Sequence, residues 1–345
     1  MANIVICADG TWNRPEEDLA KDVPTNVLRL ARAIKPTSAG GKQHVFYDWG
    51  LGSYHSKVLA GGLGCGIHKN IEDGYRYIVQ NYAPGDKLYF FGFSRGAYTV
   101  RALCGLINNC GILKRNNARL FVEAWRIYKS SAKQCRPNAD AVKTFRSKFC
   151  HQSRSVHFVG VWDTVGALGI PFSLMGLFDG DDEFYNTKMG GNVAIARHAL
   201  AIDEQREDFE PTIWKPRPGV DLKQVWFAGV HSDVGGSYPP DKKTGLRASD
   251  VPLQWMMREA TAAGLGLESY LGAEITDGKK AKLHKSRKHI FRAKRPKYRS
   301  LLNSEISLLI HPSVKFRDQH DANYRPRNLK ALVEAEGWNA LPLGS

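Results

Sequence analysis

The chain has 345 residues, 43% of them hydrophobic, and its 49 Lys and Arg outnumber its 34 Asp and Glu. This length and composition suffice for a large core and exclude both a disordered chain and a small disulfide-dependent domain. No apolar run approaches the roughly 18 residues that span a membrane, and no leader segment precedes the first predicted strand. We therefore expect a single domain, residues 1–345, made in the cytoplasm, with signal-independent export left open.

Short apolar runs and amphipathic segments alternate along the chain. Because this alternation is typical of a parallel sheet, we expect an α/β fold with a mainly parallel sheet and helices on both faces. The predicted strands are residues 3–8, 43–47, 88–93, 155–162 and 225–230, and the predicted helices are 25–34, 67–80, 97–107, 119–129 and 253–263. Residues 196–201 also look helical, which favours structural roles for His198 and Asp203.

Other segments have a distinct composition. Residues 166–184 and 211–221 are rich in Gly, Pro and aromatic residues, so we expect loops and a cap over the site. The glycine-rich stretch 61–66 lacks a preceding strand and a Gly-Lys-Ser/Thr ending, which favours a close-packed turn over a phosphate loop. The cysteines form no C-x-x-C pair, and we expect reduced thiols and no zinc or other metal. They are Cys7, Cys65, Cys104, Cys110, Cys135 and Cys150.

A possible nucleophile follows the strand at 88–93. Gly92-Phe93-Ser94-Arg95-Gly96 stands between this strand and the helix at 97–107. Strand, G-x-S-x-G and helix together are the setting of a nucleophile elbow, in which a strained turn exposes the serine hydroxyl. The alternative is a tight strand-to-helix turn with no catalytic role.

A serine nucleophile needs a base and a group that orients the base. Asp163 and His231 each follow a predicted strand, and the carboxyl ends of parallel strands meet at one edge of a sheet. We therefore expect Ser94, Asp163 and His231 to converge there as a catalytic triad. Asp233 is the rival carboxylate. His311 and His320 are rival bases, but neither follows a strand.

The amide of Arg95 is the expected first oxyanion donor, because it follows the nucleophile. A second donor is expected from the turn Asp9-Gly10-Thr11, which follows the first strand. The carboxylate of Asp9 either takes part in the site or caps this turn. The side chain of Arg95 either meets an anionic head group or pairs with a nearby carboxylate.

Five stretches of the chain together form a recognisable set of motifs: Ala8-Asp9-Gly10-Thr11-Trp12-Asn13, Gly92-Phe93-Ser94-Arg95-Gly96-Ala97, Gly160-Val161-Trp162-Asp163-Thr164-Val165, Arg197-His198-Ala199-Leu200-Ala201-Ile202-Asp203-Glu204 and Trp226-Phe227-Ala228-Gly229-Val230-His231-Ser232-Asp233-Val234-Gly235-Gly236. They resemble the serine α/β-hydrolase family that includes the catalytic domains of type VI secretion phospholipase effectors, many of whose members are uncharacterised hydrolases. The resemblance runs from about residue 3 to about residue 317 and implies the same three catalytic residues and a phospholipid acyl ester as the substrate. This chain has Ser237 where the family usually carries a third glycine, and its length leaves little room for the effectors' extra membrane-engaging domains.

Positive charge is concentrated in one segment. Residues 279–299 hold 11 Lys and Arg and no acidic residue, whereas the rest of the chain is close to neutral. The segment is either a solvated loop, a contact with an anionic membrane surface, or a nucleic-acid contact. Nucleic acid is the least favoured, because few aromatic residues interrupt the basic ones.

The sequence thus predicts a serine esterase or lipase that forms an acyl-enzyme, acts on phospholipid acyl esters and needs no cofactor. One alternative is a carboxylesterase of small soluble esters. The other is a non-catalytic protein that binds anionic membrane or nucleic acid on a hydrolase scaffold. The acyl chain length and the oligomeric state are not encoded in any recognisable pattern.

Overall fold

The computed structural model describes residues 1–10, 13, 15–18, 21–49, 63–165, 189–287, 295–301 and 308–344, with only the backbone of 63–66. The described strands form one sheet in the order β2-β3-β1-β4-β5-β6-β7-β8. Only the β2–β3 pair is antiparallel among them. The strands are β1 (Asn3–Ala8), β2 (Thr37–Ser38), β3 (Gly41–Asp48), β4 (Lys87–Phe93), β5 (Val156–Trp162), β6 (Val193–Ala201), β7 (Asp221–Phe227) and β8 (Leu309–Ile310).

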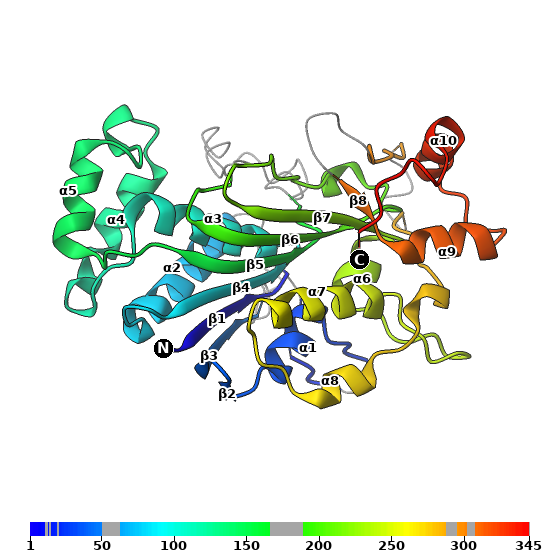
Figure 1. Cartoon of the computed structure of the whole chain (residues 1–345), viewed down its shortest axis with the longest axis horizontal. Helices are drawn as coiled ribbons and strands as arrows, with labels where there is room; N and C mark the ends of the chain where they lie inside the picture. The colour runs from blue at the N-terminus through cyan, green and yellow to red at the C-terminus, as the bar shows by residue number, and fades with distance from the viewer. Residues whose placement is uncertain are drawn as a thin grey trace.

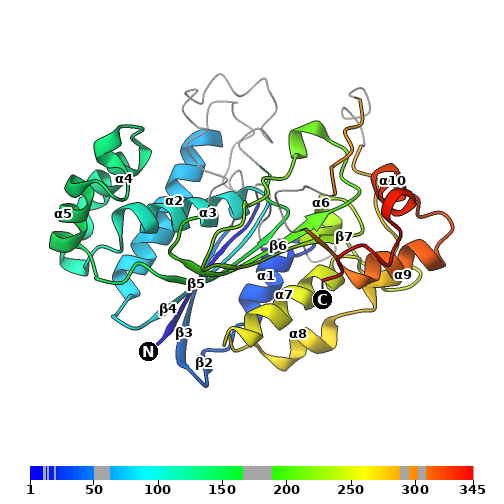
Figure 2. The same ribbon diagram turned by 45° about the horizontal axis from the view of Figure 1, so that its top comes forward.

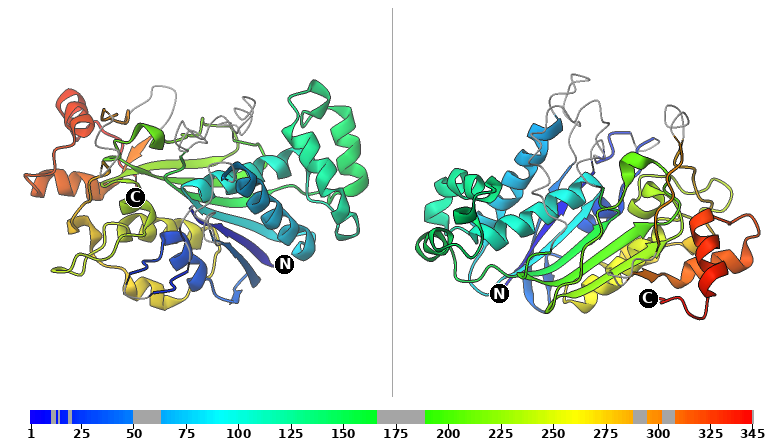
Figure 3. Two further views of the ribbon diagram at one scale, coloured as in Figure 1. Left: turned by 180° about the vertical axis from the view of Figure 1, so that it is seen from behind. Right: turned by 90° about the horizontal axis from the view of Figure 1, so that it is seen from above.

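Helices cover both faces of this sheet, as Figures 1 and 2 show. α2 and α3 lie on one face, and α1 and α7 lie on the other; the two views of Figure 3 agree. The expected α/β-hydrolase-like fold class is therefore confirmed. The helices are α1 (Asn26–Ala33), α2 (Leu63–Asn81), α3 (Arg95–Cys110), α4 (Phe121–Lys129), α5 (Asp140–Phe149), α6 (His231–Gly235), α7 (Asp250–Ala262), α8 (Ser269–Glu274), α9 (Pro312–His320) and α10 (Arg327–Glu336).

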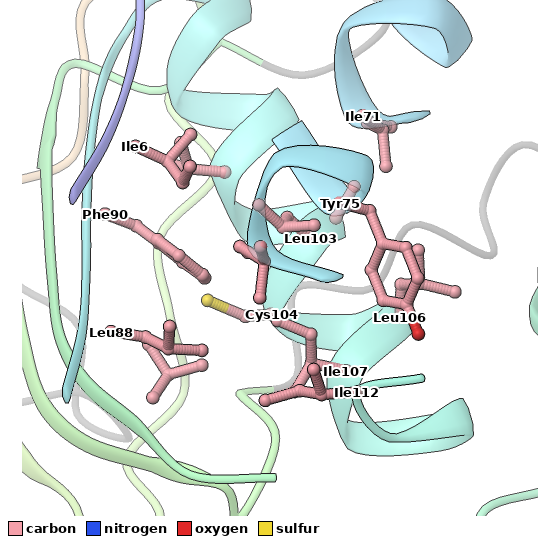
Figure 4. Packing of buried hydrophobic residues seen from close by; sticks show 14 of the residues in the cluster. Ile6, Ile71, Tyr75, Leu88, Phe90, Leu103, Cys104, Leu106, Ile107 and Ile112 are labelled. Atoms are coloured by element: carbon pink, nitrogen blue, oxygen red, sulfur yellow. The ribbon is translucent and has the colours of Figure 1, made fainter. Parts of the chain in front are cut away.

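Alternate residues of the central strands supply the two cores. Ile6 of β1 and Phe90 of β4 pack against α2 and α3, as Figure 4 shows, whereas Val5 and Tyr89 belong to the core under α1 and α7. Because side chains alternate across a strand and both faces are covered, both strands are largely apolar after their first residues, Asn3 and Lys87. All six residues of β1 are buried.

The prediction of a helix at residues 196–201 was wrong. These residues belong to β6, which lies between β5 and β7 with parallel pairing on both sides. In a strand buried on both faces the polar–apolar alternation disappears, so a run of Ala and Leu looks the same in a strand and in a helix.

Three segments were expected to be turns or loops. The turn prediction was wrong for residues 63–66 of the glycine-rich stretch, which are helical and begin α2. Residues 61 and 62, and all of 166–184, lie outside the described residues. Residues 211–220 run without a regular helix or strand and contain two bridge residues, Pro211, which pairs with Val165, and Lys215; β7 begins at Asp221. The amide of Thr212 donates to the carbonyl of Thr164 at 2.9 Å, so this loop lies beside the turn of Asp163.

The carboxyl ends of the parallel strands form one edge of the sheet. Asp9 follows β1, Ser94 follows β4, Asp163 follows β5, and His231 follows β7 after a three-residue link. This edge is where ligands bind in open α/β sheets. The fold therefore assembles residues that are far apart in the sequence.

Candidate active site

Ser94 occupies a strained turn between β4 and α3. Its backbone has φ 57° and ψ −121°, a conformation that L-residues rarely adopt and that costs about 1–3 kcal/mol. The two flanking glycines permit the turn: a Cβ on Gly92 would lie 2.5 Å from the carbonyl oxygen of Gly96, and one on Gly96 would lie 2.1 Å from that of Ala8. The amide of Ser94 donates to the carbonyl of Trp162 at 3.1 Å, which ties the turn to the end of β5.

Asp163 and His231 form a buried pair at the same edge. Nδ1 of His231 lies 2.6 Å from Oδ2 of Asp163, and both side chains are almost fully removed from solvent. Asp163 also has a positive φ of 40°, so its turn is strained like that of Ser94. Its Oδ1 accepts the amide of Ala201 at 3.0 Å, and its own amide donates to the carbonyl of Ala199 at 2.7 Å.

Aromatic rings fix the imidazole of His231. The ring of Phe93, the residue before Ser94, lies 4.6 Å from it, and the ring of Phe209 meets it edge-on at 4.9 Å. A Cβ on Gly235 would lie 2.0 Å from the Phe93 ring, so α6 packs directly on the residue that precedes Ser94. The structure thus brings the Asp163–His231 pair against the turn that carries Ser94.

Arg299 completes the surroundings of Asp163. Its Nη1 lies 2.7 Å from Oδ1 of Asp163, and its Nη2 lies 3.1 Å from Oδ2. The same guanidinium donates to the carbonyls of Ala201 and Phe209. Only 2% of Arg299 is exposed, so this member of the basic segment is not part of a charged surface. The sequence analysis missed this contact, because one arginine among eleven basic residues has no local feature that marks it as buried.

The charges around the pair set its protonation. Burial alone would raise the pKa of Asp163, but the Arg299 charge and the His231 hydrogen bond outweigh it and hold the pKa well below the ordinary value. Burial lowers the pKa of His231, and the hydrogen bond and charge of Asp163 partly offset this effect. At neutral pH the pair is therefore an ionised carboxylate beside a neutral imidazole.

The turn after β1 lies next to Ser94. A Cβ on Gly10 would lie 3.2 Å from Cβ of Ser94. The carboxylate of Asp9 accepts the amide of Gly10 at 2.8 Å and the hydroxyls of Thr25 and Tyr47, and burial raises its pKa to about 6. These bonds favour the capping role for Asp9, and they engage the Gly10 amide. Thr11 lies outside the described residues.

The side chain of Arg95 forms no ion pair with any residue that the structure describes. Burial lowers its pKa to about 10. Of the two roles expected for this side chain, pairing with a carboxylate has no support in the described part of the chain.

The rival carboxylate and bases have other partners. Asp233 accepts the amides of Val230 and His284 and lies 2.7 Å from Nδ1 of His284, so it orders the chain around α6. His311 stacks on Phe227, and His320 is exposed and bonded to its own helix.

The second His/Asp pair of the sequence also has structural partners. His198 accepts the amide of Thr164, and its pKa falls to about 3 on burial. Asp203 accepts the amide of Gly229 at 2.6 Å, and burial raises its pKa to about 7.

A serine on a strand–helix turn, beside a buried Asp–His pair at the carboxyl edge of a mainly parallel sheet, is the arrangement of an α/β-hydrolase-like protein. The family described as "T6SS, Phospholipase effector Tle1-like, catalytic domain" matches residues 2–259. This match covers most of the chain, and the chain belongs to that family. The resemblance seen in the five sequence stretches is thereby confirmed.

Two individual proteins are also similar to this chain. The uncharacterized protein YEL023C of Saccharomyces cerevisiae is 26% identical over 238 residues, which cover 63% of this chain and 33% of the yeast protein. A crystal structure of an uncharacterized protein from Pseudomonas aeruginosa is 17% identical with a TM-score of 0.45, covering 80% of this chain and 49% of that one. The chain therefore spans only part of the length of either protein.

Proposed function

We propose that this protein is a serine hydrolase that cleaves the carboxylic acyl esters of phospholipids through an acyl-enzyme. The observation that carries the proposal is the 2.6 Å contact between Oδ2 of Asp163 and Nδ1 of His231. The imidazole of His231 packs on Phe93, the residue before the strained turn of Ser94. Family membership supports a lipid substrate.

In the proposed reaction, Nε2 of His231 takes the proton of Ser94 Oγ as this oxygen bonds to the ester carbonyl carbon. Asp163 holds the proton on Nδ1 and balances the charge of the imidazolium. The tetrahedral intermediate then loses its alcohol, here a lysophospholipid, which takes the proton from Nε2. Water deprotonated by His231 attacks the acyl-serine, and the fatty acid leaves as Ser94 recovers its proton.

The negative charge that develops on the carbonyl oxygen needs hydrogen-bond donors. The first backbone amides of α3 have no acceptor within their own helix, and the amide of Arg95 directly follows the nucleophile. We assign the second donor to the turn after β1, because a Cβ on Gly10 would lie 3.2 Å from Cβ of Ser94. The Gly10 amide already donates to Asp9, so the amide of Thr11 is the proposed donor. Each such donor contributes roughly 10²–10³ in rate.

The test is hydrolysis of vesicles of a defined phosphatidylglycerol, with the products identified by mass spectrometry. We expect equal amounts of fatty acid and lysophospholipid from the natural sequence and neither product from Ser94→Ala. Release of diacylglycerol or phosphatidic acid would instead place the cleaved bond at the phosphate and contradict the acyl-ester assignment.

The same experiment separates the two alternatives. A short soluble ester that is cleaved while phospholipid is not would favour a carboxylesterase. Binding to vesicles with no turnover of either substrate would favour a non-catalytic binder on a hydrolase scaffold.

A further inference from the structure

A cavity of about 380 Å³ lies beside α6, the short helix that begins with His231. Its walls come from Ser232 and Asp233 of that helix, from the chain that follows the helix, and from the start of the basic segment around Lys282 and Lys285. The cavity therefore meets this helix at Ser232 and Asp233, the two residues that follow the proposed base in the chain.

The lining of this cavity is strongly basic. Lys242, Arg247, Lys282 and Lys285 all contribute to it, and none of them forms an ion pair within the described ranges.

The two carboxylates that line the cavity already have other partners. Asp233 is bonded to the ring of His284 and to two backbone amides, and Asp241 accepts the amides of Lys243 and Thr244. The four cations of the lining therefore outnumber its two carboxylates, and only the charge of Lys282 is recorded as interacting with one of these carboxylates, Asp241, within the described ranges.

Arg247 supplies an independent indication of a missing acceptor. Its backbone is fixed, because its amide donates to the hydroxyl of Thr276 at 3.0 Å and its carbonyl lies against Gly278, where a Cβ would approach to 2.2 Å. Its Nε is buried and has no hydrogen-bond partner among the described residues. Buried donors are almost always satisfied in folded proteins, so the guanidinium of this lining residue has hydrogen-bonding capacity that the described residues leave unused.

The wall between the cavity and α6 is well ordered. The ring of Tyr238 stacks on that of His284 with centroids 3.9 Å apart, and His284 is in turn bonded to Asp233. These contacts join the basic segment to the helix of His231. A ligand in the cavity would consequently be held at a fixed position relative to the proposed catalytic pair.

We propose that this cavity binds a phosphate group, which in the proposed reaction is the head-group phosphate of the phospholipid. A phosphate offers several acceptor oxygens to cations that converge from different sides, and guanidinium and ammonium groups both bind it through charge-assisted hydrogen bonds. The lipid part of this assignment rests on the proposed function. The phosphate part rests on the cavity alone.

The probe is glycerol 3-phosphate, titrated by calorimetry into the full chain carrying Ser94→Ala, so that the measurement needs no turnover. The cavity variant carries Arg247→Gln, Lys282→Gln and Lys285→Gln. The matched control carries Lys243→Gln, Lys280→Gln and Arg295→Gln, which removes the same charge from exposed neighbours that do not line the cavity. The double variant Lys282→Gln and Lys285→Gln, which changes only exposed side chains, replaces the triple variant if the latter does not fold.

We expect the cavity variant to bind glycerol 3-phosphate at least about tenfold more weakly, because each lost charge-assisted hydrogen bond corresponds to about a factor of ten or more. The control should bind as the parent does. A second arm measures binding to phosphatidylglycerol vesicles. If glycerol 3-phosphate does not bind but the cavity variant alone loses vesicle binding, the phosphate that the cavity recognises is that of the lipid head group. Equal binding by both variants and the parent, or an equal loss in both variants, would overturn the proposal. Neither result depends on whether Ser94 is a nucleophile.

Discussion

Arg299 binds both carboxylate oxygens of Asp163 from a position 136 residues further along the chain. Among the described residues, Oδ1 of this carboxylate accepts from Arg299 and the backbone amide of Ala201, and Oδ2 is shared between Arg299 and His231. The orienting carboxylate of the proposed triad is therefore held by a cation on one side while it holds the imidazole on the other. Arg299 acts through Asp163 and is a positioning residue.

The first prediction concerns Arg299→Gln and the pH profile of kcat/KM. The charged groups near His231 are Asp163, Glu204, Arg206 and, behind Asp163, Arg299. Removing the Arg299 charge leaves the surroundings of His231 more negative, which favours the imidazolium and raises the pKa of His231. Since the base must be neutral, the acid limb of the profile should move to higher pH.

The matched control for this prediction is Arg299→Lys. It keeps the charge but cannot bind both oxygens, so the acid limb should stay near its original position. Both variants should have a lower free energy of unfolding than the parent at pH 7. For Arg299→Gln the decrease should reach up to about 3–5 kcal/mol, because the buried ion pair loses one partner. An acid limb that stays in place or moves to lower pH in Arg299→Gln would contradict the positioning role.

The second prediction separates the two candidate carboxylates. Asp163→Asn should lower kcat by about 10⁴, because an amide favours the wrong tautomer of the base, on the precedent of serine proteases. Asp233→Asn should cost far less, since Asp233 contacts His284 and backbone amides rather than His231. Steady-state kinetics on a soluble ester decide between them, and a larger loss in Asp233→Asn would transfer the orienting role to that residue.

The third prediction concerns Ser237, the departure from the family's glycine. Its φ of 76° lies in the left-handed region, which costs a residue with a Cβ about 1–2 kcal/mol. Ser237→Gly removes this strain but increases the entropy of the unfolded chain, which offsets part of the gain. The free energy of unfolding should therefore rise by up to about 1 kcal/mol. The control is Gly236→Ala, which should destabilise because its Cβ would lie 2.6 Å from the amide of Asn26. A lower melting temperature for Ser237→Gly would contradict the strain at this position.

The fourth prediction concerns the basic segment and anionic membranes. With Arg299 buried, ten basic residues of 279–299 remain and the segment has no acidic residue, and we propose that these basic residues attract the protein to anionic lipid. Such attraction is screened beyond about 8 Å at physiological ionic strength. Co-sedimentation with anionic vesicles should fall steeply as salt is added, while hydrolysis of a short soluble ester should barely change. Vesicle binding that is insensitive to salt would leave the segment as a solvated loop.

Within the described ranges, none of the helices has the length and apolar character that a membrane crossing requires.

The sequence predicted most strands of the sheet and which strands the candidate site residues follow. It did not predict the side-chain contacts that fix these residues in place. β1 and β4 were predictable because each is a short apolar run that ends at a polar turn. β6 was not, because a strand covered on both faces loses its periodicity. Arg299 could not be found from the sequence, since a buried ion pair between distant residues leaves no local pattern.

The charge of the basic segment was likewise only partly interpretable. The residue count predicted that the segment is positively charged. In the structure, however, its basic residues have different surroundings: Arg299 is buried, Lys297 lies 3.5 Å from Glu210, and Lys282 and Lys285 line a cavity. Composition therefore located the positive charge without distinguishing a surface from a site.

Covalent labelling with a fluorophosphonate tests the central claim most directly, because the reagent reacts with activated serines whatever the natural substrate is. We expect one modification, at Ser94, that is lost in Ser94→Ala and strongly slowed in His231→Ala, with mass spectrometry of the labelled peptide giving the site. Labelling should also decline at low pH as His231 gains a proton, at a pH below the ordinary histidine value of about 6.5, because burial lowers its pKa. A folded protein that does not react, or that is labelled on another residue, would contradict the assignment of Ser94 as the nucleophile.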